Sequence, residues 1–379
     1  MIRFLHSSDW QLGMTRHYLS AEAQARFTAD RINVIRRIGA VAQQRGAQFI
    51  VVAGDVFEHA NLPPADVARA LDAMGEVDVP IYLLPGNHDP LGASSIYRNP
   101  QFVATKPSSV HVLDRVGAVR VADRVELLAA PWFGKHPESD PVVDALAGVQ
   151  SDGTTRILVG HGMLSGLTYG DDESATEIRR EPLEQALAAG AIHYVALGDR
   201  HIRWPADGHG AIQYSGSPES TSFHEPGLGQ VLEVEITAGR PRVTPHTVGC
   251  WRHLLLERDL STDADLDQLG TELAGLPRKE CTIVKHALRG TLNLRQAARL
   301  DALLERYGEV FASLARWQRH SNIAVLADEA EYDELPVTGY LRTAVDQLQN
   351  QSRRGDDDAA EALKLLYRLA SPTFAGGAR

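Results

Sequence analysis

The pattern of apolar and polar residues at the start of the chain predicts a strand followed by a long helix. The run IRFLH (2–6) is short and mostly apolar, which favours a first strand. The segment 21–45 then carries apolar residues at helical spacing over its whole length. Ser20 in front of it and Gly46 behind it are residue types that cap helices at their N-terminal and C-terminal ends.

The same alternation continues further along the chain. FIVVAG (49–54) and IYLLPG (81–86) are short aliphatic runs of the kind found in strands that are buried on both faces. Between them, Pro63 and Pro64 open a helix that extends to about Met74. An order of strand, helix, strand, helix and strand predicts right-handed crossovers and a layered α/β core.

The middle of the chain is richer in predicted strands. The runs are VHVL (110–113), AVRVA (118–122), VELLAAP (125–131), RILVG (156–160), YVALG (194–198), AIQYSG (211–216) and QVLEVEI (230–236). Two sheets packed face to face, with helices on their outer faces, accommodate so many short strands. We therefore expect a main α/β (α+β) domain over residues 1–248, built as a two-sheet β-sandwich flanked by helices.

The pattern changes after this domain and predicts two further parts, a small α+β domain over 249–333 and a helical tail over 334–379. Strands alternate in the small domain with helices near 263–275 and 293–307. In the tail, TGYLRTAVDQLQNQ and AAEALKLLYRLA have the spacing of amphipathic helices. Their apolar stripes comprise Leu341, Val345 and Leu348 in the first helix, and Ala362, Leu365, Leu366 and Leu369 in the second.

Composition and charge narrow the function only slightly. Of the 379 residues, 44% are hydrophobic and 23% are charged, as is usual for soluble globular proteins. No apolar run is long enough for a membrane span, and the N-terminus lacks the apolar centre of a signal peptide, so a cytoplasmic protein is expected. The net charge of −11 does not favour nucleic acid as a partner, and it does not exclude one, because basic residues can cluster on one face.

Five loops that follow predicted strands carry side chains able to bind metal ions. They are Asp9-Trp10-Gln11, Gly54-Asp55, Gly86-Asn87-His88-Asp89, Gly160-His161-Gly162 and Gly198-Asp199-Arg200-His201. In α/β sheets, sites gather beyond the carboxyl ends of the strands, so we expect these residues to converge. Each loop alone has an ordinary explanation, as a turn cap or a structural histidine. The five together, in this order, favour a metal site.

This succession of motifs resembles the calcineurin-like metallophosphoesterase superfamily and, within it, the SbcD-type DNA repair nucleases, which act with an SbcC-type ATPase. The stretches that carry the resemblance are DWQLG (9–13), GDVFE (54–58), PGNHDP (85–90) and YSGSPESTSFHEPG (214–227). The resemblance covers residues 1–240 well and the following domain more loosely. It implies a metallophosphoesterase fold and metal-dependent hydrolysis of phosphodiester bonds.

The resemblance also implies which residues hold two divalent ions that share one carboxylate. Asp9, Gln11, Asp55 and His201 would hold the first ion, and Asp55, Asn87, His161 and Asp199 the second. Two such ions can clamp the attacking and leaving oxygens of a phosphoryl transfer and lower the pKa of a bound water. His88 would contact the phosphate or protonate the leaving alkoxide, and Asp89 would orient the His88 imidazole.

Two positions depart from the family pattern. Histidine is usual where Gln11 stands, and the last motif is usually G-H-x-H, in which Asp199 here replaces the first histidine. Both changes put oxygen in place of an imidazole nitrogen, which favours Mn²⁺, with Mg²⁺ as the alternative, over softer ions. Because an amide is a weak ligand, the first ion is expected to bind less tightly than the second.

Basic side chains near these loops are candidates for substrate binding. Arg16 and His17 follow the first motif, although a solvated loop explains them equally well. Arg200 and Arg203 flank His201 and are the stronger candidates for contacts with phosphate.

We therefore expect a DNA exonuclease, with endonuclease activity left open, that acts in DNA repair with an SbcC-type ATPase bound to its helical tail. One alternative is a small-molecule phosphodiesterase or phosphatase, although such a substrate needs neither the extra domain nor the tail. Another is a DNA-binding module whose catalysis is weakened, which Gln11 and Asp199 keep open. A homodimer is also compatible with the sequence.

Overall fold

The protein is described by a computed structural model over residues 1–135, 137, 139–167, 177–326, 337–356, 358–359, 362–363 and 365–366. The chain divides into two compact units, Met1–His253 and Leu254–Arg379, which are described separately. No helix in these described ranges has the length and apolar composition needed to cross a membrane.

The first unit contains two sheets. The six-stranded sheet has the order β11 (Arg240–Thr247), β10 (Gln230–Thr237), β1 (Ile2–Ser7), β2 (Ile50–Val52), β3 (Ile81–Leu83) and β4 (Val110–Val112). The five-stranded sheet has the order β5 (Gly117–Ala122), β6 (Val125–Ala129), β7 (Thr155–His161), β8 (Tyr194–Gly198) and β9 (Ile212–Tyr214). Strands β1 to β4 are mutually parallel, as are β6 to β9, so the carboxyl ends of the strands in each set share one edge.

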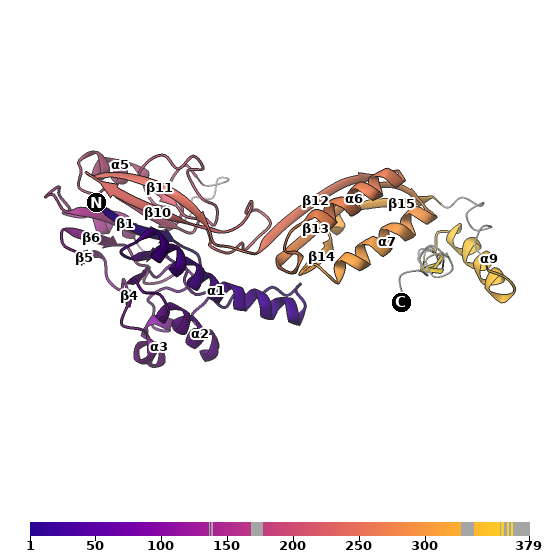
Figure 1. The fold of residues 1–379 in the computed structure, drawn as a ribbon, viewed down its shortest axis with the longest axis horizontal. Helices are drawn as coiled ribbons and strands as arrows, with labels where there is room; N and C mark the ends of the chain where they lie inside the picture. The colour runs from indigo at the N-terminus through magenta and orange to yellow at the C-terminus, as the bar shows by residue number, and fades with distance from the viewer. Residues whose placement is uncertain are drawn as a thin grey trace. The chain divides into compact units, whose positions relative to one another are not determined.

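Helices cover the outer faces of both sheets (Figure 1). They are α1 (Ala21–Arg45), α2 (Pro64–Gly75) and α3 (Pro100–Thr105) beside the first sheet, with the short 3-10 helix η1 (Ile96–Arg98), and α4 (Pro141–Leu146) and α5 (Arg180–Ala188) beside the second. Phe4, Val51, Leu127, Ile157 and Tyr194 belong to the apolar layer between the two sheets. The predicted two-sheet sandwich flanked by helices is confirmed.

Local sequence accounts for α1 completely. The Ser20 hydroxyl accepts a hydrogen bond from the amide of Ala23, and Gly46 ends the helix with a φ of 65°, so both predicted caps are confirmed. Strand β11 was not predicted, because Pro241 and Pro245 interrupt its sequence. Its place at the edge of the sheet explains why it tolerates residues that cannot donate to a neighbouring strand.

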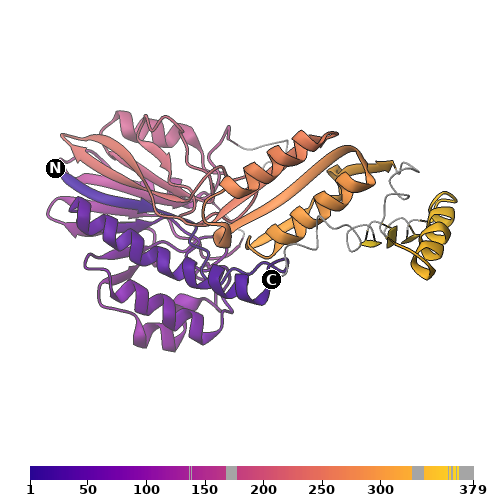
Figure 2. The same cartoon turned by 45° about the vertical axis from the view of Figure 1, so that its right-hand side comes forward.

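The second unit is a small α+β assembly (Figure 2). It is built from β12 (Arg252–Leu260, which begins at the end of the first unit), α6 (Asp263–Gly275), β13 (Thr282–Asn293), α7 (Leu294–Gly308), β14 (Ser313–Arg316) and β15 (Asn322–Leu326), with 3-10 turns η2 (Lys279–Cys281) and η3 (Gln318–His320). Side chains of α6 and α7 share one apolar core with the sheet, among them Leu266, Leu269 and Leu300. The predicted helices near 263–275 and 293–307 are confirmed.

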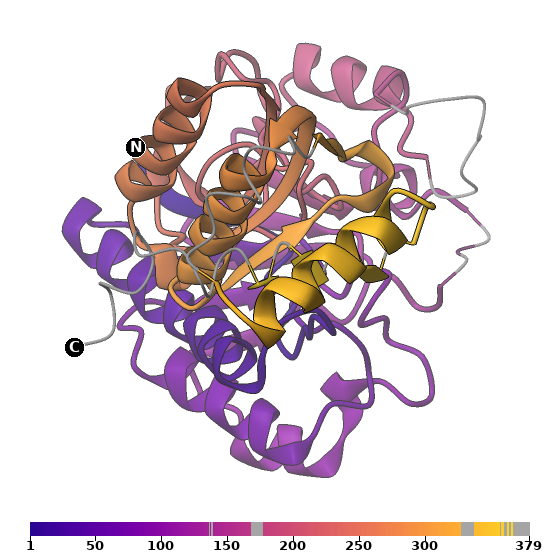
Figure 3. The same cartoon turned by 90° about the vertical axis from the view of Figure 1, so that its right-hand side faces the viewer.

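The first tail helix, α9 (Tyr340–Ser352, yellow in Figure 3), packs within its own unit. Val345 is buried in a small cluster with Leu294 and Ala298 of α7 and with Leu363. Leu341, predicted to lie on the same stripe, is 51% exposed. Most of the predicted second helix, including Leu369, lies outside the described residues.

Candidate metal centre

Acidic and imidazole side chains from both sheets meet where the parallel strands end. Asp9 follows β1, Asp55 follows β2, His161 ends β7, and Asp199 follows β8. Ligand atoms of Asp9, Asp55 and His161 all lie within 4.8 Å of one another, and the three side chains are buried. The convergence predicted from the strand order is therefore observed.

The backbone at this edge adopts an uncommon conformation. Four non-glycine residues of the site have positive φ angles: Asp9 at 53°, Gln11 at 44°, Asp55 at 53° and Asp199 at 90°. Such residues cost on the order of 1–3 kcal/mol each and persist only where the surroundings hold them. Here the amides of Asp9 and Gln11 donate to the carbonyls of Gly54 and Asp55, both at 3.0 Å, so the first two loops support each other.

Glycines let the loops approach one another closely. A Cβ atom on Gly54, whose φ is 93°, would lie 2.0 Å from His161 Nδ1. A Cβ atom on Gly86 would lie 2.3 Å from Asp55 Oδ1. The glycines that precede the ligand residues are thus required by packing within the site.

The first half of the centre contains Asp9, Gln11 and His201. His201 Nε2 lies 3.9 Å from Asp9 Oδ1 and 3.2 Å from Gln11 Nε2. Gln11 is only 2% exposed, and its amide oxygen has no hydrogen-bond partner among the described residues. A buried oxygen without a donor is the kind of atom that a cation satisfies, so Gln11 fits a ligand role.

The other ring nitrogen of His201 is held by residues outside the predicted site. Nδ1 lies 2.8 Å from the Thr221 hydroxyl and 3.2 Å from Glu225 Oε1. A carboxylate behind one ring nitrogen fixes the ring and directs the other nitrogen towards the site, as is common for histidines that bind metals. Thr221 and Glu225 are functional residues that the motif spacing did not identify, although both lie in the quoted stretch 214–227.

The second half contains Asp55, Asn87, His161 and Asp199. His161 Nε2 lies 3.3 Å from Asp55 Oδ1 and 3.8 Å from Asp199 Oδ1, and His161 Nδ1 donates to the Ala53 carbonyl at 2.8 Å. The outer end of the Asn87 amide lies 2.9 Å from His161 Nε2 and 3.0 Å from Asp55 Oδ1. With its nitrogen there, the amide donates hydrogen bonds to these atoms. With its oxygen there, a cation has to lie between the acceptors.

The electrostatics of the cluster favour a cation. Burial raises the pKa of Asp9 to about 6, although the charges of His201 and His161 act to lower it. Burial would lower the pKa of His161, but the charge and hydrogen bond of Asp55 outweigh it and hold that pKa well above its usual range. Buried carboxylates therefore demand positive charge nearby, from protons on the imidazoles or from divalent cations. The donor set fits divalent metal ions.

His88 lies at the open side of the cluster. Its side chain is 40% exposed, and its Nε2 lies 4.0 Å from Asp55 Oδ2. The Glu58 carbonyl lies 2.9 Å from His88 Nδ1, so this carbonyl orients the ring. The ring thus presents Nε2 towards the site and to a molecule entering from solvent.

The predicted role of Asp89 is wrong in its geometry. Its carboxylate accepts hydrogen bonds from the amides of Gly86 (2.7 Å) and Phe57 (3.0 Å) and from the Tyr97 hydroxyl (2.6 Å). Those three donors turn it away from the His88 imidazole, so Asp89 fixes the loop backbone and the Glu58 carbonyl holds the ring.

The predicted substrate-binding residues fall into two groups. Arg200 and Arg203 are partly buried, and the Nε atom of each has no hydrogen-bond partner in the described part of the chain. In contrast, Arg16 donates to the Thr221 carbonyl at 2.6 Å, and the exposed His17 packs edge-on against Tyr18. Arg200 and Arg203 therefore have more guanidinium donors available for a ligand.

Gln11→His tests whether Gln11 reaches the first cation. The imidazole is a stronger donor, so we expect Mn²⁺ and Co²⁺ to bind at least about tenfold more tightly, within the range of changes around metal ligands. Isothermal titration calorimetry measures this, with the exposed Gln48→His as control. Equal cation affinity of both variants and the original protein would show that Gln11 is not a ligand.

The chain is similar in sequence to known phosphoesterases. A sequence profile of the calcineurin-like phosphoesterase family matches residues 2–229. Two proteins that carry the name of the SbcD subunit of the SbcCD nuclease are similar: that of Rhodobacter capsulatus is 25% identical over 64% of this chain and 69% of its own length, and that of Bacillus subtilis is 27% identical over 62% and 66%. The crystal structure of TT1561 of Thermus thermophilus has a TM-score of 0.41 and 12% identity over 65% of this chain and 99% of its own.

Proposed function

The chain belongs to the calcineurin-like phosphoesterase family and is a hydrolase of phosphodiester bonds, and from this we propose that it is a metal-dependent DNA nuclease. The observation that carries the proposal is the buried cluster of Asp9, Asp55 and His161 at the strand ends. The two similar proteins named as nuclease subunits support DNA as the substrate.

The residues proposed to hold two divalent cations are those of the two halves of the centre. Asp9, Gln11 and His201 lie on one side, Asn87, His161 and Asp199 on the other, and Asp55 would serve both. When bound, such ions polarise the phosphoryl oxygens and make water a better nucleophile. Because most of the donors are oxygen atoms, Mn²⁺ is the proposed ion and Mg²⁺ the alternative.

The chain's own residues act on the substrate from the open side. In the protonated imidazole, His88 Nε2–H donates to the phosphate or passes its proton to the leaving oxygen as the phosphorus–oxygen bond breaks. The Glu58 carbonyl at Nδ1 keeps the ring in position for this transfer. Arg200 and Arg203 would bind phosphate oxygens, for which the planar guanidinium is well suited.

Cleavage of two substrates in the presence of Mn²⁺ tests the function. A DNA nuclease is expected to cleave both end-labelled linear DNA and bis-p-nitrophenyl phosphate, and to lose both activities when the cations are removed by a chelator. Cleavage of the small ester alone would support a small-molecule phosphodiesterase. Binding of DNA without cleavage of either substrate would support the weakened binding module.

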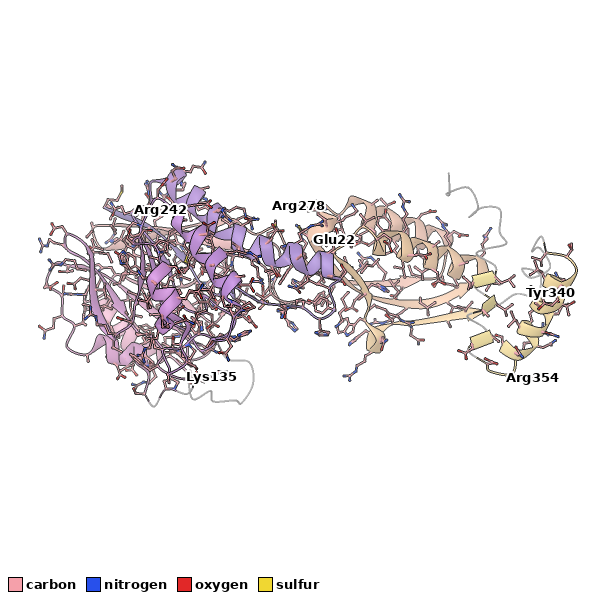
Figure 4. The ribbon with its side chains drawn as sticks, turned by 90° about the horizontal axis from the view of Figure 1, so that it is seen from below. Glu22, Lys135, Arg242, Arg278, Tyr340 and Arg354 are labelled. Carbon is pink, nitrogen blue, oxygen red and sulfur yellow. The ribbon has the colours of Figure 1, made fainter. Side chains whose placement is uncertain are left out.

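We also propose that the tail binds an SbcC-type ATPase, the partner that the names of the similar proteins imply. The packed residues of α9 cannot provide this surface, because Val345 is buried on its own unit. The available apolar side chains are those of Tyr340 (86% exposed, labelled in Figure 4), Leu341 (51%) and Leu365 (49%). Exposed apolar residues on a helix are typical anchors for a partner's groove.

Replacing Tyr340 and Leu341 together by Ser is expected to abolish co-purification with the ATPase subunit while Mn²⁺-dependent cleavage of bis-p-nitrophenyl phosphate continues unchanged. The control is Val310→Ser, which changes a 47% exposed apolar residue of the same unit. The truncation after Glu334 should also lose the partner, but it uncovers Leu294 and Ala298 as well. Full recovery of the complex with the double variant would place the interface elsewhere.

A further inference from the structure

The stretch 214–227 builds a cavity that the proposed chemistry does not use. The cavity has a volume of about 210 Å³ and lies directly beside the metal centre, since His201 forms part of its wall. Arg203, Ser215, Ser217 and the loop 225–230 form much of the remaining wall. A ligand held here would therefore lie next to any phosphate bound at the centre.

Two polar groups in the cavity wall lack partners. Ser217 is 3% exposed, and its hydroxyl has no hydrogen-bond partner among the residues that the structure describes. The same holds for Nε of Arg203. A buried polar group without a partner costs about 1–3 kcal/mol, which a bound ligand would offset.

The acidic group in the wall is already committed to other donors. Glu225 accepts hydrogen bonds from the Thr221 amide at 2.7 Å and from the Thr221 hydroxyl, and it lies 3.2 Å from His201 Nδ1. Behind the wall, the buried guanidinium of Arg31 donates to the Ser220 carbonyl at 3.1 Å and adds a positive charge. The charge that stays available to a ligand in the cavity is that of Arg203.

We propose that this cavity binds a phosphate group, that of a nucleotide adjacent to the scissile one in a nucleic-acid strand. A guanidinium beside a hydroxyl is a common arrangement for phosphate oxygens. The position beside His201 allows the scissile phosphate and its neighbour to be held together. The assignment of the ligand to a strand rests on the proposed nuclease function, whereas phosphate binding itself does not.

The first test measures phosphate binding without metal ions. The chelator-treated full chain is titrated with inorganic phosphate by calorimetry, and Arg203→Ala and Ser217→Ala are each expected to weaken binding about fivefold to tenfold. The matched controls are Arg242→Ala, on the exposed face of β11 (labelled in Figure 4), and Ser108→Ala in an exposed turn. Absence of phosphate binding, or equal losses in test and control variants, would overturn the proposal even if the protein is a nuclease.

The second test asks whether the ligand belongs to a strand. With Mn²⁺, Arg203→Ala and Ser217→Ala are expected to raise KM for an oligonucleotide about tenfold and to leave KM for bis-p-nitrophenyl phosphate unchanged, because that ester has no neighbouring phosphate. Equal effects on both substrates would show that the residues act on the scissile phosphate, and would overturn the adjacent-phosphate assignment. Phosphate binding in the first test without any effect on oligonucleotide KM would assign the cavity to a free phosphate ligand and would equally overturn it.

Discussion

Asp55→Asn is expected to abolish divalent-cation binding in both halves of the centre, and phosphodiester hydrolysis with it. Asp55 is the carboxylate that joins the two halves, because its Oδ1 lies 3.3 Å from His161 Nε2 and its ligand atoms lie within 4.8 Å of those of Asp9. The amide has nearly the same shape but no charge, so the fold is retained. We expect Mn²⁺ affinity to fall by at least about 100-fold, the upper end of effects measured for residues outside the ligand set.

Thermal unfolding with and without Mn²⁺ gives a measurement that does not depend on activity. A ligand at 100 times its Kd stabilises the folded state by about 2.7 kcal/mol, so Mn²⁺ should raise the Tm of the original protein. The Asp55→Asn variant should show no such rise, whereas the exposed control Asp123→Asn should behave like the original protein. A normal Mn²⁺-dependent rise in the Asp55 variant would contradict the shared role of this carboxylate.

His88→Ala is expected to lower kcat on DNA by about 10²–10⁴-fold, the usual contribution of a positioned proton donor. Mn²⁺ affinity should not change, because the His88 ring lies on the open side and its Nε2 is 4.0 Å from the nearest Asp55 oxygen. Activity assays and calorimetry on the same preparation check both expectations. The control is His111→Ala, which removes an exposed imidazole from β4.

The choice of leaving group separates the two roles considered for His88. An alkoxide leaving from DNA needs a proton, whereas nitrophenolate is a weak base and leaves without one. If His88 is the proton donor, His88→Ala should affect DNA cleavage far more than hydrolysis of bis-p-nitrophenyl phosphate. If it only positions the phosphate, both substrates should suffer equally. Loss of Mn²⁺ affinity in this variant would instead identify His88 as a ligand.

The local sequence was sufficient to predict the elements that hold the centre and the order in which its residues occur. Helix α1 has the predicted ends, because Ser20 and Gly46 act on adjacent backbone groups. Asp9, Asp55 and His161 were predicted to meet because parallel strands end at a common edge, a rule that needs only the order of strands. These features depend on hydrogen bonds within a few residues or on topology, and both are written into short patterns.

Only the tertiary structure decided what surrounds those residues. The partners of His201 come from Thr221 and Glu225, and the ring of His88 is held by a backbone carbonyl of Glu58, which no side-chain motif can indicate. Asp89 was assigned to the neighbouring imidazole, but its carboxylate is used by three donors that only the folded loops bring together. The helical spacing of α9 likewise predicted an apolar stripe, yet whether Val345 faces α7 or a partner depends on packing between distant segments. Periodicity fixes which residues share a face of a helix, while the surface that covers this face is chosen by the rest of the fold.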